Sequence, residues 1–221
     1  MSESLLINIS IVILFLPLVG FTTVLLLGKR IPKLYLFEVA ILGTALLLTI
    51  FVGYVKLSFY GTKDIIAAFT WISMSNAPGI GGLNVELGVK IDNITVMMLF
   101  VVNLISFLVH VFSIEYMRGD KRYTRYFAYL GIFTFSMLGI VLTHNLLMMY
   151  IFWELVGLSS YLLIGFWFEK KSASDAGKKA FIVNRIGDVG MFIGIMILFT
   201  QYKTFTFDAI YAQIAAGNVP F

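Results

Sequence analysis

Long apolar runs alternate with short polar segments along the chain, and each run is long enough to cross a membrane as a helix. About 20 residues at 1.5 Å per residue span a hydrocarbon core of about 30 Å. Six such runs, each with few charged residues, lie at positions 5–27, 34–55, 94–113, 126–143, 146–168 and 177–200. The pattern predicts an all-α integral membrane protein with six transmembrane helices.

Composition supports the same class. Of the 221 residues, 60% are hydrophobic and 13% are charged, whereas soluble domains average about 45–50% and about 25%. The chain has no cysteine, which excludes a disulfide framework and a cysteine-held iron–sulfur cluster on this chain. Its net charge of +4 comes from several short loops and not from one face, so we expect no nucleic-acid partner.

Basic residues gather in alternate loops. The loops after the first, third and fifth runs contain Lys29, Arg30 and Lys33, then Arg118, Lys121, Arg122 and Arg125, then Lys170, Lys171, Lys178 and Lys179. The segments between them carry few basic residues or balance them with acidic ones. Because loops rich in Lys and Arg stay in the cytoplasm, this distribution places the N-terminus on the extracytoplasmic side.

The extracytoplasmic loop at 57–93 contains a strand pattern. Apolar residues alternate with polar residues or glycine, as is typical of a half-buried strand. The apolar positions are Leu83, Val85, Leu87, Val89 and Ile91. Turn residues precede them at Pro78, Gly79, Gly81 and Gly82. We expect a short β-hairpin between the second and third helices, with a disordered loop as the alternative, because no partner strand is evident.

Three charged residues lie deep within the predicted helices. Glu154 lies eight residues into the fifth run and Asp188 eleven residues into the sixth, which corresponds to depths of about 12 Å and about 16 Å. Arg185 precedes Asp188 by three positions, so the two side chains share one helix face. An unpaired charge at the bilayer centre costs at least about 2.5–3.5 kcal/mol. Each of these residues therefore needs a partner, a proton or water.

Glu154 has no basic residue within its own run. A carboxyl group in such a place can bind and release protons as its surroundings change. Gly157, on the same side of the helix, leaves room for water beside it. We interpret Glu154 as a proton carrier, with a structural, hydrogen-bonded glutamate as the alternative. For Arg185 and Asp188, an ion pair that fixes helix packing and one that tunes or relays charge stand as equal alternatives.

Other polar residues in the runs allow more than one interpretation. The third run carries a stripe of Asn103, Ser106, His110 and Ser113. The stripe either forms hydrogen bonds between helices or, through His110, provides a segment of a proton wire. We favour hydrogen bonding between helices. Glu38, close to the start of the second run, is expected to snorkel to the surface beside Lys33. Two distant histidines make a poor metal site, and no phosphate-binding glycine loop is present, so we expect neither metal nor nucleotide.

Beyond these patterns, the chain resembles a known family. The stretches "YFAYLGIFTFSMLGIVLTHNLLMMYIFWELVGLSSYLLIGFW" and "KKAFIVNRIGDVG" are similar to the antiporter-like membrane subunit of respiratory complex I, called subunit L in bacteria and chain 5 in mitochondria. The stretches "FSIEYMRGDKRYTRYF" and "VKIDNIT" match the same family. The resemblance covers nearly the whole chain, and the run that begins at Trp153 is its most specific part.

The resemblance implies a proton-translocating subunit of an NADH:quinone oxidoreductase, and thus part of an enzyme, with no cofactor or redox centre of its own. NADH, FMN, iron–sulfur clusters and quinone would belong to the parent complex. In the family, the glutamate that matches Glu154 carries protons and pairs with a lysine on the seventh helix. The residues that match Arg185 and Asp188 form an ion pair that couples the subunit to its neighbour.

The same resemblance implies partners and a location. The expected partners are other membrane subunits of complex I, including a neighbouring antiporter-like subunit, together with the lipid bilayer and protons. The expected location is the bacterial inner membrane rather than the mitochondrial one.

The sequence departs from the family pattern in length, because family members carry two five-helix units of inverted topology and this sequence ends at Phe221. We expect an N-terminal fragment with a partial antiporter-like inverted-repeat fold. Residues 1–125 would hold three helices and the hairpin, and residues 126–221 the truncated start of the first five-helix unit. Multi-subunit sodium/proton antiporters, membrane-bound hydrogenases and carbon-uptake systems are the alternatives within the superfamily. A non-transporting structural membrane subunit is the alternative of a different class.

Overall fold

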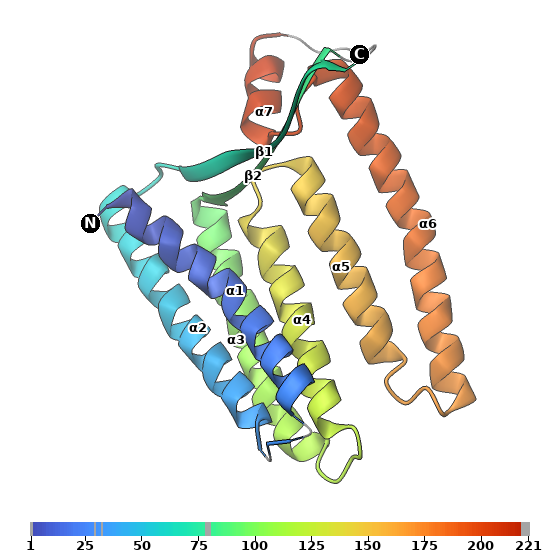
Figure 1. Cartoon of the computed structure of the whole chain (residues 1–221). Coiled ribbons are helices and arrows are strands. Elements are labelled where there is room, and N and C mark those ends of the chain that lie inside the picture. Colours follow the sequence, from blue (N-terminus) through green and yellow to red (C-terminus); the bar gives the residue numbers. More distant parts are fainter. Residues whose placement is uncertain (1, 29, 32, 78–80, 218–221) are drawn as a thin grey trace.

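The computed structural model describes residues 2–28, 30, 31, 33–77 and 81–217 (Figure 1). Lys29 and the turn residues Pro78 and Gly79 lie outside the described residues. The elements, in chain order, are α1 (Glu3–Leu27), α2 (Tyr35–Val55), a π-helical turn η1 (Lys56–Tyr60), β1 (Ile65–Ala77), β2 (Gly81–Ile91), α3 (Asn93–Tyr116), α4 (Tyr123–Leu142), α5 (Leu146–Ile164), α6 (Lys171–Tyr202) and α7 (Phe207–Ala215).

Four helices form a bundle, to which two more are added in a row. In the bundle, α1 packs against α2 and α4, and α3 packs against α2 and α4. Helix α5 packs against α4, and α6 packs against α5, so α6 lies at the edge of the row (Figure 1). The loops after α1, α3 and α5 gather at one end, which we call the basic end. The hairpin and α7 lie at the opposite end, which we call the hairpin end (Figure 1).

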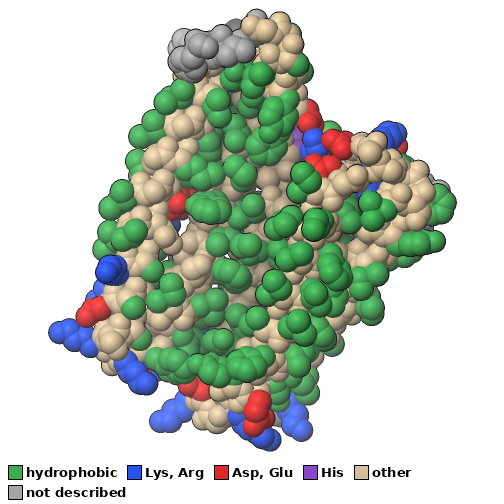
Figure 2. All heavy atoms as spheres, turned by 180° about the vertical axis from the view of Figure 1, so that it is seen from behind, with side chains coloured by type: hydrophobic (Ala, Val, Ile, Leu, Met, Phe, Trp, Pro, Cys, Tyr) green, Lys and Arg blue, Asp and Glu red, His purple; other side chains and the backbone are tan. Residues whose placement is uncertain are grey.

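The surface of the molecule fits a lipid environment. Six helices among the described residues are long and apolar enough to cross a membrane, as predicted. Figure 2 shows hydrophobic side chains over the sides of the molecule, while most Lys and Arg side chains in this view gather at the basic end. Large apolar residues such as Leu47, Phe112 and Ile186 are well exposed on these helices. Such a surface is unfavourable in water and is the expected one in a bilayer.

Some helix ends differ from the predicted ones. Helix α6 begins at Lys171 and not at residue 177, because a polar segment continues the helix beyond the apolar run. Helix α5 ends at Ile164 and not at residue 168. Helix α7 was not predicted, because its nine residues are too few for a membrane span. Hydropathy thus located the membrane segments correctly but could not set their ends.

The predicted hairpin is confirmed. Strands β1 and β2 pair antiparallel, with Ile65 opposite Ile91 and Phe69 opposite Leu87. Within β2 the predicted alternation holds, since Val85 and Val89 are buried as Ile91 is. The partner strand β1 was not evident in the sequence, because apolar residues occupy both of its faces and hide the period of two.

Polar contacts fasten the hairpin to the helices. The Lys90 ammonium donates a 2.6 Å hydrogen bond to Asp208 of α7 and lies 3.1 Å from the Asp64 carboxylate. Asn145, which caps the start of α5 by accepting a bond from the Met148 amide, also donates a 2.6 Å bond to the Glu86 carbonyl oxygen of β2. The hairpin end therefore fixes the point at which α5 begins.

The contacts of Lys90 predict a pH-dependent anchor. Burial lowers the pKa of Lys90, but the hydrogen bonds to Asp208 and Asp64 outweigh burial and leave the pKa above its usual value. The stabilisation is therefore fully present below the unfolded-state pKa of 10.5 and is lost as the pH rises through the folded-state pKa. In the full-length protein, we expect Lys90→Met to cost about 1 kcal/mol at neutral pH.

Thermal unfolding of the detergent-solubilised protein measures this cost. The matched control is Lys63→Met, because Lys63 pairs with Glu3 on the exposed surface, where ion pairs contribute little. Equal melting temperatures for the two variants at neutral pH would refute the anchoring role of Lys90.

Helices α4 and α5 approach each other closely at Gly139. A Cβ atom at this position would collide with the ring of Phe152. We expect Gly139→Ala in the full-length protein to cost about 1–3 kcal/mol, as overpacking typically does, and to lower the melting temperature. Gly157→Ala is the matched control, because a Cβ there meets nothing within 4 Å. If both variants melt alike, the two helices do not pack at Gly139 as described.

Candidate functional site

Glu154 projects from α5 towards α6. Two aromatic contacts define this interface, since Tyr150 lies 5.4 Å from Phe192 and Tyr161 lies 5.4 Å from Phe181, measured between ring centroids. Both tyrosines share the Glu154 side of α5, as the helical spacing predicts. The carboxylate of Glu154 is therefore held between two helices.

Arg185 of α6 contacts two carboxylates. Its guanidinium forms an ion pair with Glu154 across the interface, and it lies 3.6 Å from the Asp188 carboxylate one turn along its own helix. The guanidinium also lies 4.8 Å from the centroid of the Phe181 ring, within the range of a cation–π contact. The structure thus brings together the three deep charges that the sequence singled out.

The two carboxylates are held differently. Asp188 is buried and accepts a 3.0 Å hydrogen bond from the indole N–H of Trp153. Glu154 has one buried oxygen, Oε1, without a hydrogen-bond partner among the described residues. An unpaired buried oxygen costs free energy unless a proton, water or a second donor meets it. The Glu154 carboxylate therefore has an oxygen that a proton or water could still meet, whereas the Asp188 carboxylate already accepts a hydrogen bond from Trp153.

A hollow between the two helices borders one of these charges, Asp188. A hollow of about 350 Å³ between α5 and α6 is lined by Trp153, Val156, Gly157, Ser160, Val183, Asn184, Gly187, Asp188 and Met191. Its volume is many times that needed for one water molecule. Gly157 leaves this space open, because a Cβ there meets no atom within 4 Å. Glu154 is not among the lining residues, so room for water beside its carboxyl group stays a prediction.

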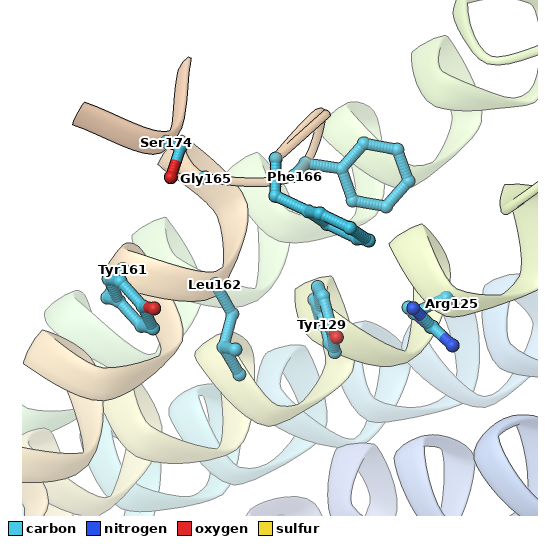
Figure 3. A pocket seen from close by; sticks show the side chains of 8 residues that line it. Arg125, Tyr129, Tyr161, Leu162, Gly165, Phe166 and Ser174 are labelled. Atoms are coloured by element: carbon cyan, nitrogen blue, oxygen red, sulfur yellow. The ribbon is translucent and has the colours of Figure 1, made fainter. Parts of the chain in front are cut away.

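A second hollow lies at the basic end of the same helices (Figure 3). It measures about 160 Å³ and is lined by Arg125, Tyr129, Tyr161, Leu162, Gly165, Phe166, Phe168 and Ser174. Tyr161 connects this hollow with the interface, because it lines the hollow and also packs on Phe181.

His110 lies elsewhere, inside the α1–α4 bundle. It is fully buried, and its Nε2 atom is 3.9 Å from the Glu38 carboxylate. The expectation that Glu38 snorkels to the surface is wrong, because Glu38 is completely buried. The stripe on α3 does face the bundle interior, with Asn103 donating a 3.0 Å hydrogen bond to Thr49 of α2. The structure does not bring His110 and Glu154 together in one site.

Two contacts of the site were not predicted from the sequence. For the pairing of Glu154 with Arg185, the similar depths of the two residues in adjacent helices were a usable signal. The hydrogen bond from Trp153 to Asp188 had no signal, because it depends on the rotation of one helix against the other. Within the described ranges, no group of three or more His, Cys, Asp or Glu residues is arranged to hold a metal ion.

Two family descriptions match the chain. Residues 77–127 match the N-terminal region of chain 5 of NADH-ubiquinone oxidoreductase (complex I). Residues 143–219 match the transmembrane region shared by NADH:quinone oxidoreductase and Mrp antiporter proteins. The second match contains all three charges of the α5–α6 interface.

Curated relatives belong to the same group. Subunit 5 of the NAD(P)H-quinone oxidoreductase of Paulinella chromatophora is 46% identical over 156 residues, which is 69% of this chain and 22% of the relative. Subunit L of the NADH-quinone oxidoreductase of Mycobacterium tuberculosis is 39% identical over 150 residues, 68% of this chain and 23% of the relative. The matched region thus corresponds to about a quarter of the length of these relatives.

A solved structure has the same fold. A chain of the membrane-bound sulfane sulfur reductase, an archaeal respiratory membrane complex, superimposes with a TM-score of 0.71. The similarity covers 99% of this chain and 41% of that chain at 18% sequence identity. At this identity the comparison establishes the fold alone.

Proposed function

We propose that the whole protein translocates protons as part of an NADH:quinone oxidoreductase complex. The reason is that the chain belongs to the family of antiporter-like membrane subunits that includes subunit L (chain 5) of this enzyme. Glu154 would bind and release the transported proton. The observation that supports this role is the position of Arg185 between Glu154 and Asp188. One guanidinium placed between two carboxylates can change its share of contact with each.

The proposed cycle has two states. With Arg185 against Glu154, the carboxylate is ionised and its charge is compensated. When Arg185 withdraws towards Asp188, Glu154 loses its counter-ion in a membrane interior, where an unpaired charge costs at least about 2.5–3.5 kcal/mol. A proton from water in the neighbouring hollow then takes the place of the counter-ion. The return of Arg185 releases that proton.

Asp188 makes this exchange possible. It keeps a permanent carboxylate beside Arg185, fixed by the indole of Trp153, so the arginine remains paired in both states. Because breaking a buried pair completely costs about 3–5 kcal/mol, a guanidinium that changes partners moves at a much lower cost than one that loses its only partner. We assign Arg185 and Asp188 to coupling and Glu154 to proton carriage.

The other assignments follow from the same role. NADH, FMN, iron–sulfur clusters and quinone belong in this proposal to other subunits, and a neighbouring antiporter-like subunit is the partner. The hairpin end faces the extracytoplasmic side of a bacterial inner membrane, since the basic end carries the Lys- and Arg-rich loops. Residues 126–221 belong to the first inverted-repeat unit, and residues 1–125 precede it. The two parts are in contact, because α4 packs on both α1 and α5.

A sodium/proton antiporter subunit is the second candidate, because the description that matches residues 143–219 includes Mrp antiporters. Membrane vesicles containing the full-length protein in its complex distinguish the two. We expect NADH oxidation to acidify the vesicle lumen without added sodium, and acidification to stop with a quinone-site inhibitor. A proton flux that requires a sodium gradient and ignores NADH would support the antiporter and refute the oxidoreductase assignment.

A further inference from the structure

The α1–α4 bundle encloses an acid and an imidazole that the proposed cycle does not use. Glu38 of α2 and His110 of α3 are both fully buried. Within the described part of the chain, neither carboxylate oxygen of Glu38 has a hydrogen-bond partner, and neither has Nε2 of His110. Groups of this kind are costly to bury alone. The separation of 3.9 Å between Glu38 Oε1 and His110 Nε2 makes each the natural partner of the other.

Neighbouring helices leave room for this carboxyl group. A Cβ atom on Gly131 of α4 would collide with Glu38, and one on Gly20 of α1 would come within 3.1 Å of its side chain. A hydrogen bond with a donor–acceptor distance of about 2.9 Å requires Glu38 and His110 to approach by only about 1 Å. Because Gly20 and Gly131 have no side chains, the Glu38 carboxyl group fits beside the His110 imidazole and keeps room to move about 1 Å closer to it.

The tautomer of His110 follows from its other contact. Its Nδ1 atom lies 2.8 Å from the carbonyl oxygen of Ser106. A carbonyl oxygen can only accept a hydrogen bond, so Nδ1 carries the hydrogen. In the neutral ring, Nε2 then has a free lone pair, and Nε2 is the atom that lies closest to Glu38. His110 is therefore oriented as a base towards the carboxyl group.

The charge balance indicates a single proton. A neutral carboxyl beside a neutral imidazole has no net charge, and neither has a carboxylate beside an imidazolium. Removing the shared proton leaves an unpaired carboxylate, and adding another leaves an unpaired imidazolium; both are unfavourable in a membrane interior. The stable states of the pair therefore differ only in whether Oε1 or Nε2 holds the proton.

No other charge competes for the pair within the described ranges. His110 is the ion-pair partner of Glu38 there. From α4 the Phe127 ring approaches the imidazole, with ring centroids 5.9 Å apart, and α1 contributes Gly20. The titratable groups nearby are three tyrosines that pack on Phe127, namely Tyr35, Tyr123 and Tyr126. The Tyr123 hydroxyl donates a hydrogen bond to a backbone carbonyl. The pair is thus enclosed by apolar and aromatic groups.

Hydroxyl and amide groups lie on the hairpin-end side of the pair. The Ser106 hydroxyl, one turn from His110, is hydrogen-bonded to the Thr134 hydroxyl of α4. Asn103 follows on the same side of α3 and donates a 3.0 Å hydrogen bond to the Thr49 hydroxyl of α2. The Thr134 hydroxyl also donates a 3.0 Å hydrogen bond to the Leu130 carbonyl oxygen, so these polar groups are bonded to one another and to the backbone.

We propose that Glu38 and His110 form a second proton-binding site, which holds one proton between Oε1 and Nε2. The proton moves from the carboxyl oxygen to the imidazole nitrogen and back, so no other reactant is needed. This site lies inside the α1–α4 bundle, whereas Glu154 faces α6. The second site is therefore independent of the Glu154 cycle.

Infrared spectroscopy of the assembled complex tests the site. All variants carry Glu154→Gln, which removes the Glu154 carboxyl band and any translocation that depends on it. We expect a C=O band from a buried carboxyl group, of partial and temperature-dependent intensity, that disappears in Glu38→Gln. In His110→Gln the proton has no second acceptor, so the band should reach full intensity and become insensitive to temperature.

Glu115→Gln is the matched control, because Glu115 is a highly exposed carboxylate near the end of the same helix as His110. Its substitution should leave the band unchanged. A band that survives Glu38→Gln, or one that His110→Gln does not alter, would overturn the proposed site. If Glu38→Gln prevents assembly, the change of the band in His110→Gln is the test of the site, because that variant keeps Glu38.

Discussion

Glu154→Gln in the full-length protein is expected to stop proton translocation while the complex still assembles and oxidises NADH. Glutamine keeps the size and the polarity of the side chain but cannot ionise, so it can neither pair with Arg185 nor carry a proton. A positioned proton-transfer group typically contributes about 10²–10⁴-fold to a rate. We therefore expect a loss of at least tenfold in the rate of acidification, measured in membrane vesicles with NADH.

The control for this prediction is Asp175→Asn, which removes a carboxylate at the exposed start of the same interface helix, α6. It should translocate at the rate of the unmodified protein. If Glu154→Gln translocates at that rate too, Glu154 carries no proton. If Glu154→Gln fails to assemble, the glutamate is a structural group, as the alternative interpretation holds.

Arg185→Gln is expected to have the largest effect on assembly. It leaves Glu154 and Asp188 close together without their cation, and breaking a buried pair by removing one partner costs about 3–5 kcal/mol. The side chains of Arg185 and Glu154 are 35% and 23% exposed, so solvent screening lowers the cost below this range. The amount of assembled complex, measured by native gel electrophoresis, should drop several-fold.

A second substitution separates charge from packing. Adding Asp188→Asn to Arg185→Gln removes one of the two unpaired carboxylates, so assembly should recover in part while translocation stays low. Asp188→Asn alone should leave Arg185 bound to Glu154 and so reduce translocation more than assembly. If the double variant assembles no better than Arg185→Gln, the ion pairs do not determine the stability of this interface.

Hydropathy predicted the helices because the bilayer imposes one length and one polarity on every membrane segment. The same argument could not locate the start of α6, since its first turns lie beyond the apolar core. The hairpin was predicted from the alternation in β2, whereas β1 has no such alternation. Short α7 lacks the length of a membrane span, so hydropathy did not indicate it, although Thr206 at its N-cap position and Asp208 in its first turn are signals of a helix start.

The site was predicted only in part, because a sequence indicates the depth of a residue but not the rotation of its helix. Depth placed Glu154 and Asp188 at similar levels. The contact between Glu154 and Arg185 depends on which faces of α5 and α6 meet, and a single sequence does not show this. The expected lysine partner of Glu154 came from the family resemblance and stays a prediction.

Glu38 shows how distance along a helix can mislead. Its position near the start of α2 favoured snorkelling, yet the side chain points into the bundle, where Gly131 and Gly20 make room for it. The glycines that create this space are distant from Glu38 in the chain, and packing with them cannot be read from the local sequence. The burial of Glu38 could be found only from the fold.

The central claim is that Glu154 changes its protonation state as Arg185 moves. Infrared difference spectroscopy of the full-length complex during NADH turnover measures this directly. We predict a carboxyl C=O band that appears and disappears with turnover, is absent in Glu154→Gln, and no longer changes in Arg185→Gln. A Glu154 band that stays constant during turnover, or its complete absence while protons are being translocated, would contradict the claim.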